Sequence, residues 1–328
     1  MLYINDTSTD PYWNLAAEEY LLKNFKEPVF RLWRNSNSII VGQYQNTLAE
    51  IDYNYVKEND IKVVRRLSGG GAVFHDLGNL NFTFIEQKQG MEESNAMFRR
   101  FTAPIIKALN SLGVDAYIEG RNDLLIDGKK FSGNAICIYK DRILQHGTLL
   151  FSANMSNLSQ ALKSRPEKFI GKAVQSTRSR VTNISSHLTE PMELDKFQQY
   201  LGEYICNSYS NFKEYHYTPE DLAAIEELKA NKYLHDSWNF GHSPAYQLNN
   251  TGKFSGGLVE LSISAKNGRI TAMEIYGDYF FTLPTEEFIA LMTGTEHTRE
   301  AIGQKLEELP ISQYFNGITN QELLSLFF

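Results

Sequence analysis

The sequence predicts an α+β protein with a mixed or antiparallel sheet and a small second domain at its C-terminal end. Segments with helical periodicity and short strand-like runs follow one another without a regular βαβ rhythm, which argues against a parallel sheet. Two dipeptides, Asp127-Gly128 and Asn267-Gly268, stand between strand-like runs and predict tight hairpins. Residues 241–257 are rich in glycine, asparagine and serine and predict a connecting loop. We therefore expect two domains, at 1–245 and 246–328.

Composition and charge exclude several classes of protein. The chain has 328 residues, of which 42% are hydrophobic and 22% charged, as in ordinary globular proteins. Its formal net charge of −7 disfavours a nucleic-acid-binding protein, which needs a basic surface. Two cysteines are too few for a disulfide scaffold. Because the sequence shows no signal peptide and no apolar run long enough to cross a bilayer, we expect a cytoplasmic protein that binds neither nucleic acid nor membrane.

The first predicted element is a helix over residues 12–22, because Asp10-Pro11 is a helix start signal and Leu15 and Leu22 lie at helical spacing. Runs of β-branched and aromatic residues predict strands at 29–33, 38–42, 61–66 and 80–85. Apolar periodicity predicts helices at 47–59, 94–111, 155–164, 193–209 and 219–231. In the C-terminal domain we expect strands at 258–264 and 269–276 and helices at 285–292 and 297–307.

A glycine-rich loop is the strongest chemical signal. Three consecutive glycines, 69–71, follow the strand that ends in Arg65-Arg66, and Ser68 and His75 flank them. Contiguous glycines let a ligand approach the backbone, whose amides can bind an anion. The arginines supply forked donors for a carboxylate or phosphate. The loop fits neither the Walker A pattern nor the dinucleotide fingerprint, so it predicts a ligand loop of another kind.

The hairpin at Asp127-Gly128 contains a second signal. Its two-residue turn sets Leu125 opposite Lys130 and Asp123 opposite Ser132, so that Lys130 shares one face with a carboxylate and a hydroxyl. This placement is compatible with a functional role for Lys130. The alternative is that Lys129 and Lys130 are solvated residues beside a turn.

A second hairpin turns at Lys140-Asp141 and returns through a strand that holds His146 and Thr148. Strict pairing sets His146 opposite Ala135 and Thr148 opposite Gly133, on the face away from Lys130. A β-bulge at Gly133 would bring these side chains together. Cys137 has apolar neighbours and is expected to be a buried, inert thiol, and Cys206 a structural residue.

Residues 171–183 carry serine, threonine, lysine and arginine between two predicted helices. Long connections of this kind inside a compact domain are usually lids or binding loops. An exposed basic loop without function is the alternative.

Taken together, these segments resemble the lipoate–protein ligase A family, which shares its fold with biotin ligases. The matching motifs occur in the family's order and spacing, at residues 65–76, 120–123, 130–135, 146–150 and 176–183. The resemblance extends over essentially the whole chain. It implies a two-step reaction in which lipoate attacks the α-phosphate of ATP to form lipoyl-AMP, and the acyl group then passes to a lysine of a lipoyl domain.

The resemblance also assigns roles to residues. Lys130 matches the family's catalytic lysine, Asp123 a position that binds Mg²⁺, and Lys172, Arg178 and Arg180 a lid over the adenylate. The positions that match the ATP- and lipoyl-adenylate-binding site are Arg66, Ser68, Gly70, Gly71, Ala72, Val73, Phe74, His75, Asn79, Asn122, Asp123, Lys130, Ser132, Ala135, His146 and Thr148. The resemblance implies ATP and lipoate as substrates and Mg²⁺ as the metal that accompanies ATP. No permanently bound cofactor is expected.

Alternatives remain at this point. The related octanoyl or lipoyl transferases use a cysteine near the stretch that here is 120–123, where this sequence has none. A non-catalytic lipoate- or nucleotide-binding protein would not need Arg66, Asp123 and Lys130 together. The expected acceptors are lipoyl domains of 2-oxoacid dehydrogenases or the glycine-cleavage H protein. The protein is expected to be a monomer, and octanoate remains open as a substrate because a straight apolar pocket discriminates weakly.

Overall fold

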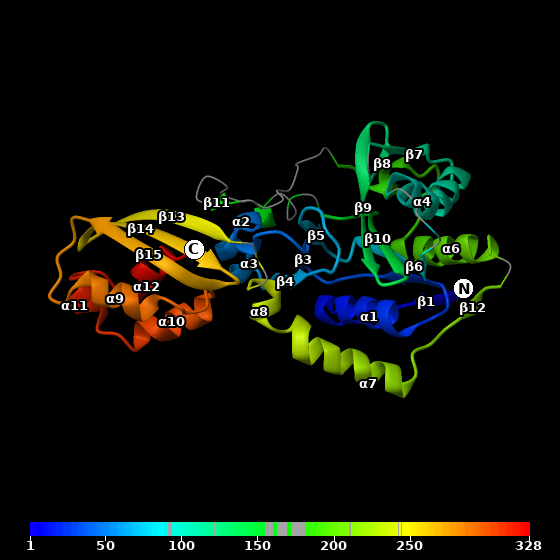
Figure 1. Cartoon of the computed structure of the whole chain (residues 1–328). Helices are drawn as coiled ribbons and strands as arrows, with labels where there is room; N and C mark the ends of the chain where they lie inside the picture. Colours follow the sequence, from blue (N-terminus) through cyan, green and yellow to red (C-terminus); the bar gives the residue numbers. More distant parts are fainter. Residues whose placement is uncertain are drawn as a thin grey trace. The chain divides into compact units, whose positions relative to one another are not determined.

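The computed structural model divides the chain into two compact units (Figure 1). It describes residues 1–88, 90, 94–120, 122–154, 156, 160–162, 169–171, 181–209, 211–241, 243 and 245–328. The first unit comprises Met1–Gly42, Asp60–Ser159 and Thr177–Leu234, and the second comprises Gln43–Asn59, Gln160–Ser176 and His235–Phe328. Two internal segments thus belong to the second unit, whereas the sequence-based division at residue 245 stays a prediction.

The first unit is built on an eight-stranded mixed sheet. Its strand order is β12-β1-β2-β6-β10-β9-β8-β7. Strand β1 runs parallel to β2 and β12, and the remaining neighbours are antiparallel. The strands are β1 (Leu2–Asn5), β2 (Val29–Trp33), β6 (Asn79–Gln87), β7 (Ala116–Glu119), β8 (Asp123–Ile126), β9 (Lys129–Tyr139), β10 (Arg142–Leu150) and β12 (Lys213–Glu214).

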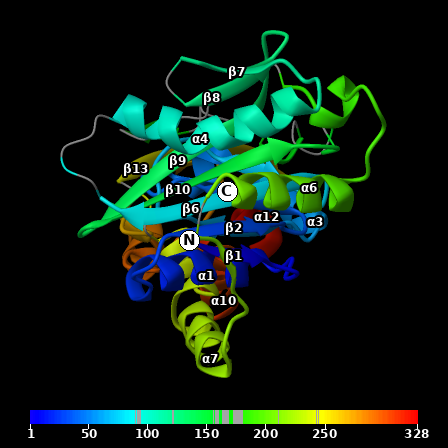
Figure 2. The same ribbon diagram turned by 90° about the vertical axis from the view of Figure 1, so that its right-hand side faces the viewer.

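Helices cover both faces of this sheet (Figure 2). Helix α4 (Ser94–Ser111) lies over one face, where its side chains and those of α6 (Leu194–Asn207) join strand residues in the main core. In that core Phe30 stacks on Phe84 with ring centroids 4.7 Å apart. The opposite face is covered by α1 (Pro11–Asn24), which Asp10 caps by accepting a hydrogen bond from the Tyr12 amide.

Helix α7 (Pro219–Leu228) and the π-helical turn Lys229–Tyr233 pack against α1. The contact includes a buried carboxylate, Glu19, which accepts hydrogen bonds from Lys232 Nζ at 2.7 Å and Tyr233 Oη at 2.6 Å. A short 3₁₀ helix, η2 (Ile184–His187), precedes α6.

A separate three-stranded sheet in the same unit holds the glycine-rich loop. Strand β3 (Ser38–Val41) runs parallel to β4 (Lys62–Arg65) and antiparallel to β5 (Val73–His75). The loop joins β4 to β5, so both its ends are fixed by ladder hydrogen bonds to β3.

The second unit is a four-stranded sheet with helices against it. The strand order is β11-β13-β14-β15, and β14 and β15 are joined by the predicted hairpin, with Asn267 and Gly268 both at positive φ. Side chains of this sheet and of the helices share a core that includes Leu248, Phe288 and Phe327. The elements are α2 (Thr47–Glu50), α3 (Tyr53–Glu58), β11 (Phe169–Gly171), α8 (Asp236–Asn239), β13 (Tyr246–Phe254), β14 (Gly257–Lys266), β15 (Arg269–Gly277), α9 (Thr285–Met292), α10 (Arg299–Glu307), α11 (Ile311–Tyr314) and α12 (Asn320–Ser325).

The α+β class and most predicted elements are confirmed, with two corrections. The helix predicted at 47–59 is two short helices, since Asp52 caps a new helix by accepting from the Tyr55 amide. The loop predicted at 241–257 is wrong over Tyr246–Phe254, which forms strand β13. Its buried residues alternate with exposed polar ones, and the composition hid this pattern. The helix predicted at 155–164 lies largely outside the described residues.

No helix in the described part of the chain is both long and apolar enough to span a bilayer.

Candidate functional site

The glycine-rich loop is held from inside by Arg66. This side chain is buried, and its Nη2 donates to the carbonyl oxygens of Gly69 at 2.7 Å and Gly71 at 2.8 Å. Its Nη1 donates to Ile40 O at 3.0 Å, which ties the loop to β3. Burial lowers the pKa of Arg66 to about 10, so the guanidinium remains a cation at neutral pH. The loop is therefore preorganised around a fixed positive charge.

Two glycines are required by this arrangement. Gly70 has a φ of 94°, in the region that favours glycine. A Cβ on Gly42 would overlap the carbonyl oxygen of Gly70, so the chain end of β3 needs glycine to let the loop approach. Arg65, also buried, donates from Nη1 to Gly42 O at 2.9 Å and holds the same junction.

A carboxylate, an imidazole and a hydroxyl form a chain beneath the loop. Glu18, from α1, lies 3.0 Å from His146 Nδ1, and His146 Nε2 lies 2.6 Å from Ser68 Oγ. Ser68 Oγ also accepts from Arg66 Nε at 3.0 Å. Burial raises the pKa of Glu18, but the charge and hydrogen bond of His146, with Arg31 and Thr83, outweigh this effect and hold that pKa below its usual value. His146 is thus oriented by an ionised carboxylate.

Sequence reasoning missed Glu18 as a site residue. The sequence did contain an indication, because Glu18 lies between Leu15 and Leu22 on the buried face of α1. A carboxylate on a buried face needs a hydrogen-bonding or charged partner. Its partners come from β6 and β10, far along the chain, so their identity was not readable from the helix.

A β-bulge places Lys130 on the same face as His146 and Thr148. The register of β8 and β9 shifts between Leu124 and Leu125, leaving Phe131 as the extra residue. Asp123 therefore pairs with Gly133, and the prediction that it faces Ser132 is wrong because the pairing was taken without a bulge. The sequence suggests a bulge at Gly133, and the structure has the bulge two positions earlier, at Phe131.

Lys130 lies beside Gly133 and Asp123. Its Nζ is 2.8 Å from Asp123 Oδ1, and a Cβ on Gly133 would come within 3.2 Å of that Nζ and 4.0 Å of Thr148 Oγ1. The lysine and aspartate side chains are 27% and 35% exposed, so solvent and ligands reach them. His146 and Thr148 alternate with Gly147 along β10 and so share a face. Lys130 and Asp123 therefore lie on the same face of the sheet as His146, which contacts Ser68 of the glycine-rich loop.

Polar residues around the bulge fix its shape. Asn122 Nδ2 donates to Asn134 O at 2.6 Å, and Asn134 Nδ2 donates to Ser132 Oγ at 3.2 Å. Ser132 is fully buried, and Ala135 pairs with His146. These predicted positions support the site through the backbone of β9.

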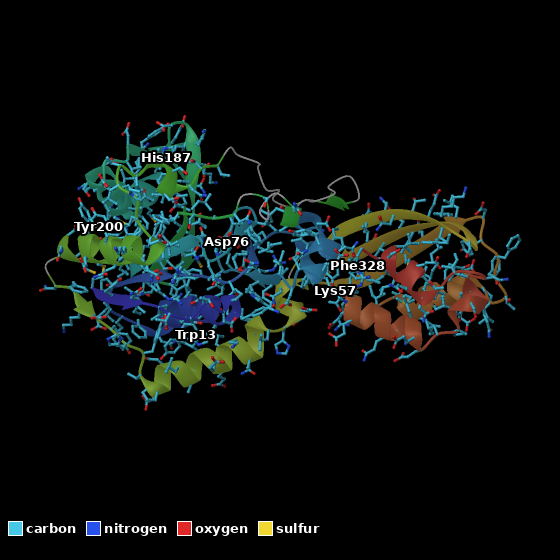
Figure 3. The ribbon with its side chains drawn as sticks, turned by 180° about the vertical axis from the view of Figure 1, so that it is seen from behind. Trp13, Lys57, Asp76, His187, Tyr200 and Phe328 are labelled. Carbon is cyan, nitrogen blue, oxygen red and sulfur yellow. The ribbon has the colours of Figure 1, made fainter. Side chains whose placement is uncertain are left out.

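The end of the predicted 171–183 loop is anchored beside Lys130. Thr182 N donates to Lys130 O at 2.9 Å, and Thr182 Oγ1 lies 2.8 Å from His187 Nε2. His187, labelled in Figure 3, is also 3.2 Å from the carboxylate of Asp127 at the hairpin turn. Lys172, Arg178 and Arg180 lie outside the described residues, so the lid remains a prediction.

The other predicted positions lie along β5 and β6. Ala72 and Phe74 are buried and Val73 is partly exposed, and Asn79 Nδ2 donates to Asn81 Oδ1 at 2.9 Å. Asp76, labelled in Figure 3, follows β5 and accepts hydrogen bonds from the Gly78 and Asn154 amides at 2.9 and 2.7 Å. It therefore fixes the turn between β5 and β6.

Both cysteine thiols have raised pKa values. Burial and the nearby carboxylates Glu18 and Glu19 raise the pKa of Cys137 to about 11, which keeps it a thiol at neutral pH. Burial raises that of Cys206 to about 12. In the part of the chain that the structure describes, no three His, Cys, Asp or Glu side chains form a metal cluster.

An α+β fold with a glycine-rich loop and a lysine on one sheet face is shared with a family of ligases, which comparison with known proteins identifies. Residues 10–206 match the family described as the lipoyl protein ligase A/B catalytic domain, and residues 243–327 match the bacterial lipoate protein ligase C-terminus. A lipoate-protein ligase of Bacillus subtilis is 41% identical over 333 residues, with 100% of both chains covered. The chain therefore belongs to the lipoate–protein ligase family, and it is a ligase enzyme.

Solved structures agree with this assignment. A bipartite lipoate protein ligase from Thermoplasma acidophilum, studied with its E2 lipoyl domain, is 28% identical with a TM-score of 0.64, covering 74% of this chain and 96% of that one. A lipoate-protein ligase A bound with ATP is 27% identical with a TM-score of 0.62, covering 74% of this chain and 98% of that one.

Proposed function

We propose that this protein uses ATP to convert lipoate into lipoyl-AMP, with release of pyrophosphate, and then transfers the lipoyl group to a lysine amine of a carrier protein, with release of AMP. A carboxylate is a poor acyl donor until its oxygen becomes part of a good leaving group, and adenylation supplies that group. The observation that carries the proposal is the placement of Lys130 on one sheet face with His146 and Thr148, the former hydrogen-bonded to the preorganised glycine-rich loop.

Lys130 is proposed to neutralise charge during adenylate formation. Charge builds up around the α-phosphate as the lipoate oxygen attacks, and a positioned cation stabilises that charge. Without substrate, the ammonium pairs with Asp123 at 2.8 Å. Because both groups are partly exposed, the lysine can exchange this partner for a phosphate or carboxyl oxygen of the substrate. Backbone amides of residues 71–74 would bind the remaining phosphate oxygens.

Mg²⁺ is proposed to enter as part of the ATP complex. Mg²⁺ is usually held by one or two carboxylates together with substrate phosphates. Asp123, whose Oδ1 pairs with Lys130, has a second carboxylate oxygen and fits this habit. The metal would offset phosphate charge, and Asp123 would orient it.

The second step needs a lysine acceptor brought to the adenylate. The proposed acceptors are lipoyl domains of 2-oxoacid dehydrogenase complexes or the H protein of glycine cleavage. A cover over the adenylate, the role expected of Lys172, Arg178 and Arg180, would protect the mixed anhydride from water until the acceptor arrives. A cytoplasmic location and a monomeric state stay predictions from the sequence.

The deciding experiment measures lipoate-dependent exchange of labelled pyrophosphate into ATP. Replacing Lys130 by alanine is expected to lower the exchange rate at least about 100-fold, as loss of a charge-stabilising donor does in other enzymes. Lys129→Ala is the matched control, because this neighbour is exposed at the turn and should leave the rate unchanged. Circular dichroism checks that both variants fold.

Three outcomes would contradict the assignment. Exchange by Lys130→Ala near the wild-type rate would remove Lys130 from the chemistry. Wild-type protein that binds ATP and lipoate without exchange would indicate a binding protein. Transfer of a lipoyl group between carrier proteins without ATP would indicate a transferase.

A further inference from the structure

A buried hydrogen-bond chain leads from Arg31 to Asn14. Arg31 is fully buried and pairs with Asp6; its Nη2 donates to Asn14 Oδ1 at 2.6 Å. A guanidinium only donates, so the Asn14 oxygen must face it. Asn14 Nδ2 accordingly donates to Ser8 O at 3.0 Å and Arg34 O at 2.9 Å, two carbonyls that only accept. The orientation of this amide is therefore determined by its neighbours.

The same orientation passes through Asn35 to His75. Asn14 Nδ2 lies 2.9 Å from Asn35 Oδ1 and has two hydrogens for three acceptors, so one hydrogen is shared between two of them. A flipped Asn35 would set its own Nδ2 against Asn14 Nδ2, donor against donor, so the Asn35 amide nitrogen faces His75 Nδ1 at 3.1 Å. That ring nitrogen must accept, because Asn35 Nδ2 can only donate. In a neutral imidazole the proton then lies on Nε2. Burial, with the charges of Arg66 and His146, lowers the pKa of His75 to about 3, which keeps the ring neutral at pH 7.

The Nε2–H donor has no hydrogen-bond partner among the described residues. His75 is 3% exposed, and Asn79 Oδ1 and Asn81 Nδ2, on β6, the next strand along the chain, are also buried and unpartnered there. Unpaired buried polar groups are rare in folded proteins and call for a partner. His75 is the last residue of β5, the strand that begins where the loop held by Arg66 ends, and the charges of Arg66 and His146 act on its ring. A ligand bound at the candidate site would supply the missing acceptor.

We propose that the Arg31–Asn14–Asn35 chain holds His75 as the neutral Nε2–H tautomer, which donates a hydrogen bond to an oxygen of the bound acyl or phosphate group. Asn14 and Asn35 are positioning residues in this scheme, because they act on the substrate through His75. The proposal rests on the proposed function for the identity of the ligand, whereas the tautomer itself does not depend on it.

The tautomer is tested directly by ¹⁵N nuclear magnetic resonance of the imidazole nitrogens, with His75 assigned by the signals missing from His75→Gln. Wild-type protein should show a protonated Nε2 and an unprotonated Nδ1. In Asn35→Asp the new carboxylate only accepts, so Nδ1 should gain a proton. A wild-type signal from the Nδ1–H form, or an unchanged His75 signal in a folded Asn35→Asp protein, would overturn the proposal.

The donor role is tested by calorimetric binding of three probes: lipoate, a non-hydrolysable ATP analogue and a sulfamoyl analogue of the acyl-adenylate. His75→Leu should weaken at least one of them about 10-fold or more, as loss of a buried hydrogen bond does. His75→Gln, whose amide reaches the Nε2 position, should recover part of the loss. Lipoate weakened alone would place the acceptor on the carboxyl group, and the ATP analogue weakened alone would place it on the phosphate.

Equal binding of all three probes by His75→Leu and wild type would refute the donor role. If wild-type protein instead fails to exchange pyrophosphate while the tautomer result holds, the proposed function fails and the positioning chain stands.

Discussion

His297 should make the second unit sensitive to mild acid. Its ring is 1% exposed, Nε2 donates to Phe327 O at 2.7 Å, and Nδ1 therefore accepts from Tyr246 Oη. Rings of Tyr246 and Phe328 stack near it, with centroids 5.7 and 5.2 Å away. The neutral ring thus has both nitrogens satisfied, and a second proton would break this arrangement.

The loss of unfolding free energy in acid follows from the pKa of His297. Burial lowers the pKa of His297 from 6.5 to about 4. Between these values the unfolded chain binds more protons than the folded one, so stability falls as pH decreases through this window. Lowering the pH from about 7 to about 5 should cost about 2 kcal/mol of unfolding free energy through this residue.

The assay is urea unfolding of the full chain at both pH values, followed by circular dichroism. Other groups also titrate, so the measured quantity is the pH-dependent change in wild type minus that in His297→Gln, and it should be about 2 kcal/mol. His216→Gln is the control, because that side chain is 86% exposed and should leave the pH dependence unchanged. The same pH dependence in wild type and His297→Gln would refute the reasoning.

Three further predictions concern the candidate site. Cys137→Ser should keep lipoate-dependent pyrophosphate exchange within about 3-fold of wild type, since its thiol stays protonated; complete loss in a folded variant would favour a thiol transferase. Gly147→Ala should destabilise the protein by about 1–3 kcal/mol in urea unfolding, because its Cβ would lie 2.6 Å from a Phe82 ring carbon; an unchanged midpoint would show that the strand relaxes. Glu18→Gln should be less stable than wild type at neutral pH, and the difference should shrink as pH falls and protonates the depressed carboxyl; a gap that widens in acid would reverse the sign argued here.

Local sequence determines several turns and helix ends of this protein. Asp127-Gly128 and Asn267-Gly268 form tight turns in which all four residues have positive φ, because asparagine, aspartate and glycine tolerate that backbone region. The helix after Asp10 begins where the capping signal predicts. The glycine-rich loop could be predicted as a candidate ligand loop from its three glycines, of which Gly70 has a positive φ.

Other features depended on contacts between distant segments. The bulge at Phe131 changes the register of β8 and β9, and the alternation of residues within the hairpin does not by itself reveal it. Strand β13 forms because β14 offers a paired edge, which overrides a composition typical of loops.

Tertiary structure also decided which polar residues belong to the site. Glu18 becomes a site residue only because β10 brings His146 within 3.0 Å of it. His75 acquires its proton position from Arg31, 44 positions earlier in the sequence, through two amides whose orientations are fixed by donors and acceptors around them. Local sequence thus determined turns, caps and loop chemistry, whereas burial and pairing across the fold determined charge state, tautomer and the face on which Lys130 lies.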